Sequence, residues 1–393
     1  MKRILITTAL LAGIMTYAGG FRVSLQGVKQ LAMAHTSAHT EDASVAFFNP
    51  AGISFIPNKL SVSVGAFGAI SEVEYQNLNT LESYKTSNPV GTPLYAAVTY
   101  KVSNSVAVGL SVTTPFGSTV KWPNDWSGNV MVQKMELKSF FFQPMISYKF
   151  NDWASIGGSF IYAKGLVDWD KANKTPDGTV NINDDKATGT GFGLGFYLKP
   201  SPKLDLSIAY RSPVDMEAKK GVLSVNVGAL SYKENFTATL PLVEEYTVGL
   251  TYKVTPKWLV SADFNYHGWE RYNKLTLNLE NSGALVTPKN FHNTKTFRIG
   301  TQYMLTDKLA GRLGYYYDES PYTDEYFIPE TPSFDANVFT GGLGYKFGKF
   351  GVDLAAAFAF PKARGVNNTY YDFYGQAKAK STYLGLGFTY NAF

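Results

Sequence analysis

Cysteine is absent from the 393-residue chain. Its absence excludes disulfides, thiolate zinc sites, cysteine nucleophiles and a lipid-modified N-terminal cysteine. Charge is also scarce, because Asp, Glu, Lys and Arg make up only 17% of the residues and the formal net charge is +5. Lys2 and Arg3 supply two of those charges, and the remaining excess is too small and scattered to indicate a nucleic-acid partner.

Long apolar runs are missing after residue 18. A transmembrane helix needs about 20 consecutive apolar residues, so the pattern excludes helical spans. Linkers and composition shifts are missing too, although a soluble chain of this length usually folds as two or more domains. Low charge with 15% aromatic residues and 36 glycines is typical of a β-barrel, whose membrane signal is spread thinly over many strands.

Residues 1–18 have the pattern of a signal peptide. Lys2 and Arg3 form a basic region, residues 4–15 form an apolar region, and residues 16–18 offer small side chains near a cleavage site. A membrane anchor is the alternative, and the apolar region is too short for one. We expect cleavage after this segment and export of the mature chain.

The rest of the chain alternates between apolar and polar residues in short runs. Because successive side chains of a strand point to opposite faces, these runs predict strands with one face toward lipid and one toward a lumen. Short breaks alternate with long ones of roughly fifteen to thirty residues, as in barrels with short periplasmic turns and long extracellular loops. The short breaks lie at 101–105, 150–153, 199–203, 253–257, 305–308 and 346–350.

This pattern predicts an all-β fold, in which residues 59–393 form a fourteen-stranded antiparallel transmembrane β-barrel. An even number of strands is the rule for single-chain bacterial barrels. The strands are expected near 59–73, 92–102, 104–115, 134–150, 153–169, 186–199, 203–217, 241–254, 257–279, 293–305, 308–318, 336–347, 350–361 and 380–393.

Three arginines are expected to face the lumen. Arg211, Arg298 and Arg312 fall out of phase with the apolar residues of their strands. Arginine can hold a carboxylate through two parallel hydrogen bonds, so these residues are candidates to bind an acidic ligand. The alternative is that they pair with lumen acids and only hold the barrel in shape; the candidate acids are Glu245, Asp263 and Asp353.

Residues 19–58 do not follow the alternation. A fourteen-stranded lumen is wider than that of an eight-stranded barrel, which side chains fill, and narrower than that of an open porin. A segment of this length ahead of the first strand is therefore a natural plug. A disordered periplasmic tail is the alternative, and the apolar content of the segment argues against disorder.

Several motifs match a known family. GGF (19–21) lies near the mature start, and DAS (42–44) is followed by FFNPAG (47–52). With these motifs the chain resembles the FadL family of outer-membrane transporters for long-chain fatty acids and other hydrophobic compounds. The resemblance implies a fourteen-stranded barrel with an N-terminal hatch at residues 19–58. It continues through PFG and WPNDWSG within 115–128, YRSPVD (210–215), LPLVEEYTVGLTYKVTPKW (240–258) and YYYDESP (315–321).

The resemblance also implies a mechanism and site residues. Hydrophobic substrate would be captured among extracellular loops, pass to a lumen site beside the hatch, and leave through a lateral opening in the wall. Phe21 matches the aromatic residue that the family places near the ligand. The hatch motif is matched by Asn49, Pro50, Ala51 and Gly52.

Lys164 is a further ligand candidate. It stands in the stretch IYAKG, which resembles a family segment that carries a basic residue. Its phase matches that of Phe160 and Tyr162, so the alternative is a lysine that reaches the outer membrane interface.

No motif predicts a metal, a cofactor or catalysis. His35 and His39 stand four residues apart, but only Glu41 and Asp42 lie nearby as further ligands. The glycine-rich stretch 189–196 lacks the helix and acidic residue that follow a dinucleotide loop. No G-x-S-x-G elbow is present. We therefore expect no bound metal, no cofactor and no enzyme.

The sequence as a whole predicts a passive transporter in the outer membrane of a Gram-negative bacterium. Long-chain fatty acids are its first candidate substrates, and aromatic or other uncharged hydrocarbons are the alternative. A structural or adhesive barrel and a general porin are the alternatives of another kind. The expected partners are hydrophobic small molecules, outer-membrane lipid and lipopolysaccharide, and the barrel-assembly machinery, whose signal the terminal Phe393 resembles. We expect a monomer without a nucleic-acid partner.

Overall fold

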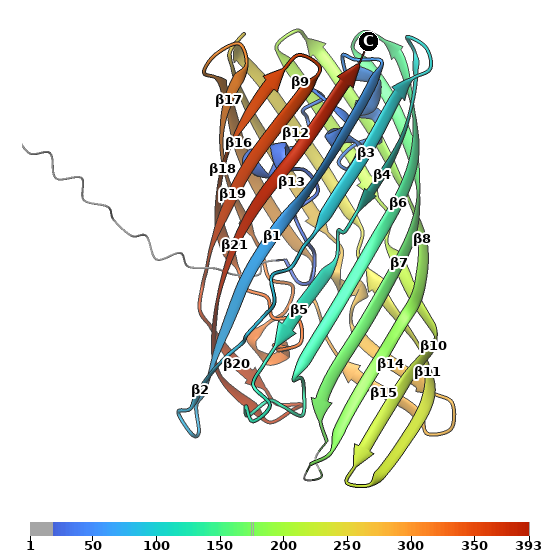
Figure 1. Cartoon of the computed structure of the whole chain (residues 1–393), viewed down its shortest axis with the longest axis vertical. Helices are drawn as coiled ribbons and strands as arrows, with labels where there is room; N and C mark the ends of the chain where they lie inside the picture. The colour runs from blue at the N-terminus through green and yellow to red at the C-terminus, as the bar shows by residue number, and fades with distance from the viewer. Residues whose placement is uncertain (1–18, 174, 176, 393) are drawn as a thin grey trace, which may run out of the picture.

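A closed antiparallel barrel of 14 strands dominates the computed structural model, which describes residues 19–173, 175 and 177–392 (Figure 1). Each wall strand is hydrogen-bonded to the next, and β21 pairs with β1 to close the ring. The predicted fold class is confirmed. The predicted signal peptide and Phe393 lie outside the described residues. The wall strands are β1 (Leu60–Asn77), β3 (Leu94–Lys101), β4 (Val106–Thr113), β6 (Lys134–Asn151), β7 (Ala154–Ala172), β8 (Thr179–Ser201), β9 (Leu204–Arg211), β12 (Glu245–Thr255), β13 (Trp258–His267), β16 (Thr294–Met304), β17 (Leu309–Asp318), β18 (Ala336–Phe347), β19 (Phe350–Pro361) and β21 (Phe373–Ala392).

The end of the barrel with the long connections is taller than the sequence pattern predicts. Several loops expected there are paired hairpins, because alternation and backbone pairing continue into these connections. β10 and β11, for example, are joined only by Gly228 and Ala229, where Gly228 adopts a φ of 58°. The strands that lengthen this end are β2 (Ser83–Lys85), β5 (Gly117–Lys121), β10 (Val214–Val227), β11 (Leu230–Leu242), β14 (Lys274–Leu279), β15 (Gly283–Pro288) and β20 (Arg364–Asn368).

Two predicted strands are interrupted. The strand expected over 203–217 divides into β9 and β10 around Pro213, which has no N–H to donate to a ladder. The strand expected over 257–279 divides into β13 and β14 around a short 3-10 helix, η3 (Trp269–Arg271). A second such helix, η4 (Asp324–Tyr326), lies in the connection between β17 and β18.

The short breaks form the turns of the opposite end, where the chain also finishes (Figure 1). This end is the periplasmic one if the barrel follows the usual rule of short periplasmic turns. Side chains alternate as predicted along β16, where Phe297 and Ile299 are 54% and 51% exposed and Arg298 between them is 5% exposed. The outward residues supply the apolar face that lipid requires. No helix of the described residues is long and apolar enough to cross a bilayer.

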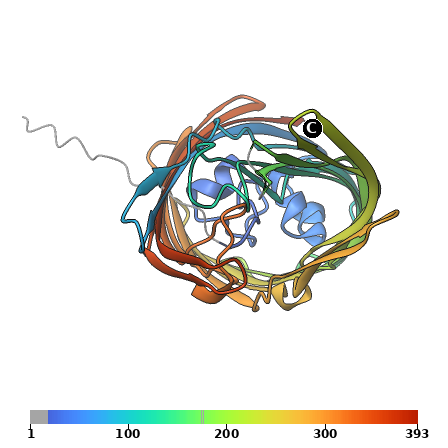
Figure 2. The ribbon, with the colours of Figure 1, turned by 90° about the horizontal axis from the view of Figure 1, so that it is seen from below.

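Residues 19–58 lie inside the barrel (Figure 2). They form α1 (Val28–Ala32) and two 3-10 helices, η1 (Ala43–Phe47) and η2 (Pro50–Phe55). Asp42 and Asn49 cap the two 3-10 helices by accepting backbone N–H groups. Almost every side chain of this N-terminal segment is buried, so the segment fills the lumen nearest the short turns and leaves the taller end to other side chains.

Candidate functional site

Asn49 anchors the N-terminal segment to the barrel wall. Its side-chain amide donates to the carbonyl of Phe196 at 2.9 Å and to Ser207 Oγ at 2.8 Å. Its side-chain oxygen accepts the backbone N–H of Ala51 at 2.9 Å. Asn49 is fully buried, and one side chain therefore satisfies groups from η2, β8 and β9 at once.

Pro50, Ala51 and Gly52 pack against a part of the wall where glycines leave space for the backbone of the segment. A β-carbon on Gly157 or Gly195 would collide with the segment at residues 49–51. The carbonyl of Ala51 also accepts hydrogen bonds from two wall hydroxyls, Ser147 Oγ at 3.0 Å and Ser155 Oγ at 2.8 Å. The four predicted motif residues, 49–52, therefore lie together against the inner face of the wall formed by β6, β7, β8 and β9.

An ion-pair cluster holds α1 to η1. The Lys29 ammonium contacts the Asp42 carboxylate and lies 2.9 Å from Glu41 Oε2. Burial alone would raise the pKa of Asp42, but the Lys29 ammonium and hydrogen bonds from Ser44 bring it below its ordinary value. The buried charges therefore compensate one another inside the segment.

The three predicted arginines face the lumen, as their phase indicates, and the structure gives each of them protein partners. Arg312 contacts Asp353 at 2.5 Å and donates to the Gln302 side chain at 2.6 Å. Arg211 lies 3.9 Å from Glu245, and its guanidinium covers the ring of Phe47. The alternative of pairing with lumen acids is therefore observed at both positions.

Arg298 is held differently. Its Nε donates to the Asn265 side-chain oxygen at 2.7 Å, and its Nη1 donates to the carbonyl of Ala34 at 3.3 Å. The guanidinium also stacks on Tyr316. Asp263, one of the candidate lumen acids, instead accepts the backbone N–H of Ser37 at 2.8 Å. Arg298 thus ties the wall to the N-terminal segment.

Lys164 does not reach the lumen. It is exposed on the outer face of β7, on the same face as Phe160 and Tyr162, which are 53% and 37% exposed. The alternation of strand side chains explains this placement, because the inward positions of β7 fall one residue to either side. The structure therefore removes Lys164 from the candidates for lumen ligand binding, and the alternative of a lysine at the membrane interface fits its position.

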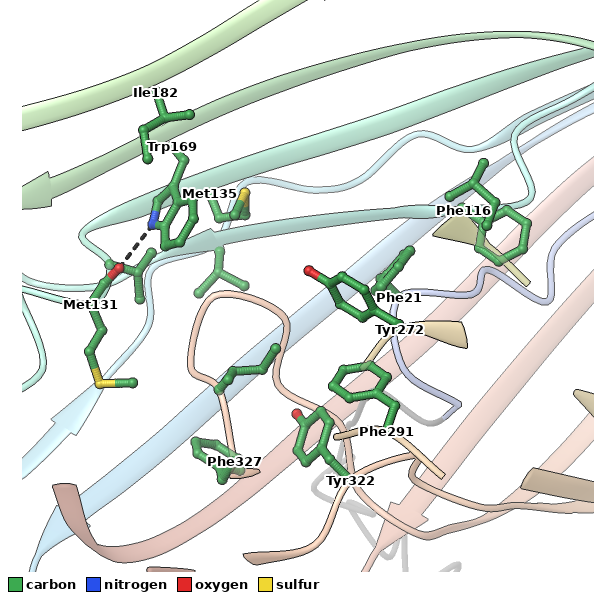
Figure 3. Close-up of a cluster of buried hydrophobic side chains, with 14 of the residues drawn as sticks. Phe21, Phe116, Met131, Met135, Trp169, Ile182, Tyr272, Phe291, Tyr322 and Phe327 are labelled. Carbon is green, nitrogen blue, oxygen red and sulfur yellow. Dashed lines mark hydrogen bonds between the residues drawn. The ribbon is translucent and has the colours of Figure 1, made fainter. Parts of the chain in front are cut away.

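An apolar chamber lies between the N-terminal segment and the long loops, and Figure 3 shows some of the buried side chains around it. Phe21, at the tip of the segment, meets Trp269 at 4.9 Å, Tyr272 at 5.8 Å and Phe116 at 6.1 Å between ring centroids. These contacts place the predicted aromatic residue at the floor of the chamber. The cavity has a volume of about 100 Å³ and is lined among others by Met135, Trp169, Ile182, Met216, Phe236 and Leu277.

One buried ion pair interrupts this apolar lining. Lys289 Nζ lies 2.7 Å from Glu330 Oε1, and the two residues are 1% and 3% exposed. Burial alone would lower the pKa of Lys289, but the Glu330 carboxylate raises it above its ordinary value. Sequence reasoning missed this pair, because the residues stand in separate loops forty-one positions apart and neither carries a motif.

A window opens in the wall beside the N-terminal segment. The ladder between β3 and β4 stops at Tyr95 and Thr113. One side-chain contact follows, where Leu94 donates its N–H to Thr114 Oγ1 at 3.2 Å. The edges meet again where Lys121 donates to Asn88 Oδ1 and Ser87 donates to the carbonyl of Lys121, both at 2.8 Å. The edges of this window, residues 89–93 and 115–120, carry Pro89, Pro93 and Pro115, which have no N–H to bridge it. Pro93 and Pro115 stand inside predicted strands, and they were the signal in the sequence that could have indicated this window.

A passage of about 240 Å³ leads through the window. Its lumen side is lined by Arg22, Leu25 and Tyr316, and its outer side by Leu94 and Lys138. Phe116, Leu137, Lys138 and Ser139 line both this passage and the apolar chamber, so the two spaces adjoin along these residues.

The N-terminal segment closes the window from inside by strand pairing. Arg22 pairs antiparallel with Phe116. Val23 donates its N–H to the carbonyl of Pro115, and Gly117 donates to the carbonyl of Phe21, both at 2.8 Å. The Arg22 side chain meets Asp318 at 3.0 Å on the opposite wall. Residues 21–23 therefore stand between the chamber and the passage.

Comparisons with known proteins agree with this architecture. A family model described as "Outer membrane protein transport protein (OMPP1/FadL/TodX)" matches residues 9–392. A putative outer membrane protein of Neisseria meningitidis, NMB0088, is 26% identical over 88% of this chain and 87% of its own. A 47 kDa outer membrane protein of Pasteurella multocida is 24% identical, with the same coverage.

Solved structures are similar in fold at low sequence identity. A FadL homologue of Pseudomonas aeruginosa superposes with a TM-score of 0.83 at 19% identity, covering 95% of this chain and 99% of its own. The toluene transporter TodX of P. putida gives a TM-score of 0.78 at 17% identity, covering 93% of this chain and 98% of its own.

Proposed function

The chain belongs to the OMPP1/FadL/TodX family of outer-membrane transport proteins for hydrophobic compounds, and we propose that it carries such compounds passively by lateral release into the outer membrane. The family is made of transport channels, which supports a non-enzymatic role. The observation that carries the proposal is the run of spaces from the apolar chamber, past Phe21 and Phe116, to the window.

The physical advantage of this route is that the substrate avoids a long path through water. Each methylene group kept out of water is worth about 0.8 kcal/mol. A molecule that enters from the loops stays against apolar side chains in the chamber. It then leaves sideways between β3 and β5 into the hydrocarbon of the bilayer.

The N-terminal segment would act as the hatch of this route. The Asn49 anchor and the glycine-lined wall fix residues 27–58, so they block a straight path to the periplasm. Residues 19–26 are held by the pairing at Arg22, by its ion pair with Asp318 and by the hydrogen bond that Gly20 donates to Ser333. Movement of this tip alone would connect the chamber with the passage.

Of the two expected substrate classes, the geometry favours uncharged molecules. The Glu330 carboxylate already neutralises Lys289, and Lys138, which also lines the chamber, is paired with Glu136. Arg211 and Arg312 are engaged by acids, and Arg298 by the N-terminal segment. A long-chain fatty acid is the second candidate, with its carboxylate sharing the N–H groups of Lys289. Assembly by the barrel machinery, contact with lipopolysaccharide and a monomeric state stay predictions.

Uptake by a deletion strain tests the proposal. Strains with and without the protein are given matched radiolabelled probes, toluene and a long-chain fatty acid, and uptake into the cell is timed. We expect the protein to speed the uptake of at least one probe. Equal rates for every hydrophobic probe would favour a structural or adhesive barrel instead.

Conductance in planar bilayers separates the proposal from a general porin. With the hatch in place, the protein should show little open current. A variant lacking residues 19–50 should conduct several-fold more, because the lumen of a barrel this wide is no longer filled. A large current in the intact protein would reject the hatch.

A further inference from the structure

The chamber contains a buried carboxylate oxygen that no described residue satisfies. Glu330 Oε1 accepts from Lys289 at 2.7 Å, whereas Glu330 Oε2 is buried and has no hydrogen-bond partner among the described residues. Glu330 lines the chamber and is 3% exposed. A second cation near it, Lys171, lies over the ring of Trp169 at 4.9 Å and is not part of the lining.

Thr331, the next residue in the chain, also carries a buried polar atom without a hydrogen-bond partner among the described residues. Thr331 also lines the chamber, is 7% exposed, and has a buried Oγ1 without a partner in the described part of the chain. Native proteins pair the large majority of buried side-chain polar atoms. Two consecutive exceptions facing one apolar cavity indicate that their partner comes from the contents of that cavity.

The chemistry of the two groups restricts that partner. An ionised carboxylate only accepts hydrogen bonds, so Oε2 needs a donor, whereas the Thr331 hydroxyl can either donate or accept. A ligand carboxylate would bring a second negative charge to Glu330 and has no proton to give. A hydrocarbon would leave Oε2 unpaired, which typically costs about 1–3 kcal/mol.

We propose that the chamber selects hydrophobic molecules that carry a hydroxyl group, with the hydroxyl donating to Glu330 and accepting from Thr331. This inference rests on the proposed function and names its preferred substrate class. The chamber, at about 100 Å³, is smaller than the engineered apolar cavity of about 150 Å³ that holds one benzene molecule, so it has room for at most a single ring. A substituted phenol combines that size with the required donor.

Binding of three ligands of matched shape tests the proposal. p-Cresol, p-xylene and 4-methylbenzoate differ only in one substituent, a hydroxyl, a methyl or a carboxylate. Calorimetric titration of the full chain in lipid nanodiscs, corrected with empty nanodiscs, gives the three affinities. We expect p-cresol to bind roughly tenfold tighter than p-xylene, although it leaves water less readily, and 4-methylbenzoate to bind weakest.

Two variants assign the preference to this site. The double variant Lys289→Met/Glu330→Met replaces the pair with apolar side chains, and it should bind p-xylene at least as tightly as p-cresol. Thr331→Val removes one hydroxyl at nearly constant shape and should reduce the preference for p-cresol several-fold, and it serves alone if the double variant does not fold. Lys257→Met, in a turn at the opposite end, should leave all three affinities unchanged.

The outcomes separate this inference from the transport proposal. Equal binding of p-cresol and p-xylene, tightest binding of 4-methylbenzoate, or a preference that survives in the variants would overturn hydroxyl selection and leave transport standing. Failure of every ligand to bind above the nanodisc background would overturn both.

Discussion

Asn49 donates a 2.8 Å hydrogen bond to Ser207 Oγ and so ties the N-terminal segment directly to β9 of the barrel wall. The residues are 158 positions apart in the chain. The contact forms because Gly195, next to it on β8, leaves the space that a side chain would occupy. The hydrogen bond of Asn49 and the space left by Gly195 together make the segment a fixed part of the barrel rather than a free tail.

Adding one methyl group to the cleared wall should dislodge the hatch. In Gly157→Ala the new β-carbon meets the backbone of Ala51, which cannot move aside as a flexible side chain would. Overpacking of this kind costs roughly 1–3 kcal/mol. We expect a lower Tm and a higher bilayer conductance.

Gly158→Ala is the matched control for that change. The neighbouring β-carbon would stand 3.8 Å from Leu194, at an ordinary packing distance on the outer side. Tm and conductance should stay at the wild-type values. Equal Tm and equal conductance of the two alanine variants would show that η2 does not pack directly against Gly157.

Acid should release the contact between α1 and η1 only at low pH. The pKa of Asp42 is lower in the folded protein than in an unfolded chain, where it is about 3.9. The carboxylate therefore stabilises the fold fully above that value, and the contribution is lost as the pH falls through the lower folded pKa. We expect constant conductance between pH 8 and pH 5 and a rise below about pH 4.

Asp42→Asn provides the comparison for the acid experiment. This variant removes one of the two carboxylate charges on Lys29, the other being that of Glu41, and should show raised conductance already at pH 7. A wild-type rise near pH 6 would contradict the role given to this carboxylate and point to a histidine.

Strand alternation and turn spacing predicted the wall of the barrel because both depend on local geometry. The phase of Arg298 on β16 is read directly from its exposed neighbours Phe297 and Ile299. The phase of Lys164 likewise points outward, and the interface alternative followed from it. Alternation along a strand does not indicate which residues a side chain contacts across the lumen.

The contacts that could not be predicted from the sequence join residues that are distant in the chain. Lys289 meets Glu330 across two loops, and Arg22 pairs with Phe116 at the edge of the window. Each contact depends on how loops fold over the barrel, which alternation does not determine. The family resemblance indicated a lateral opening, and only the broken ladder locates a window between β3 and β5.

Breaking the ion pair of the chamber from one side should cost more than removing it. Lys289→Met leaves Glu330 charged and buried without a counter-ion, which typically costs about 3–5 kcal/mol. The double variant Lys289→Met/Glu330→Met should unfold closer to the wild type. Urea unfolding of the three proteins measures the difference, and a single variant as stable as the double would show that Glu330 reaches water.

The most direct test of the account is a covalent bond between the tip of the hatch and the edge of the window. Arg22 and Phe116 form an antiparallel pair without direct hydrogen bonds between them, the kind in which Cα atoms lie about 4.5 Å apart. Because the native chain has no cysteine, the variant Arg22→Cys/Phe116→Cys can form only this disulfide within the chain.

Uptake of a labelled hydrophobic probe is then timed in cells carrying this variant, with and without reductant, and in cells carrying either single cysteine as controls. Lateral release past the hatch tip predicts slow uptake in the oxidised form, recovery after reduction, and no response to reductant in the controls. Equal uptake by the oxidised and reduced forms would show that substrate does not pass between the hatch tip and the window, and would contradict lateral release by this route.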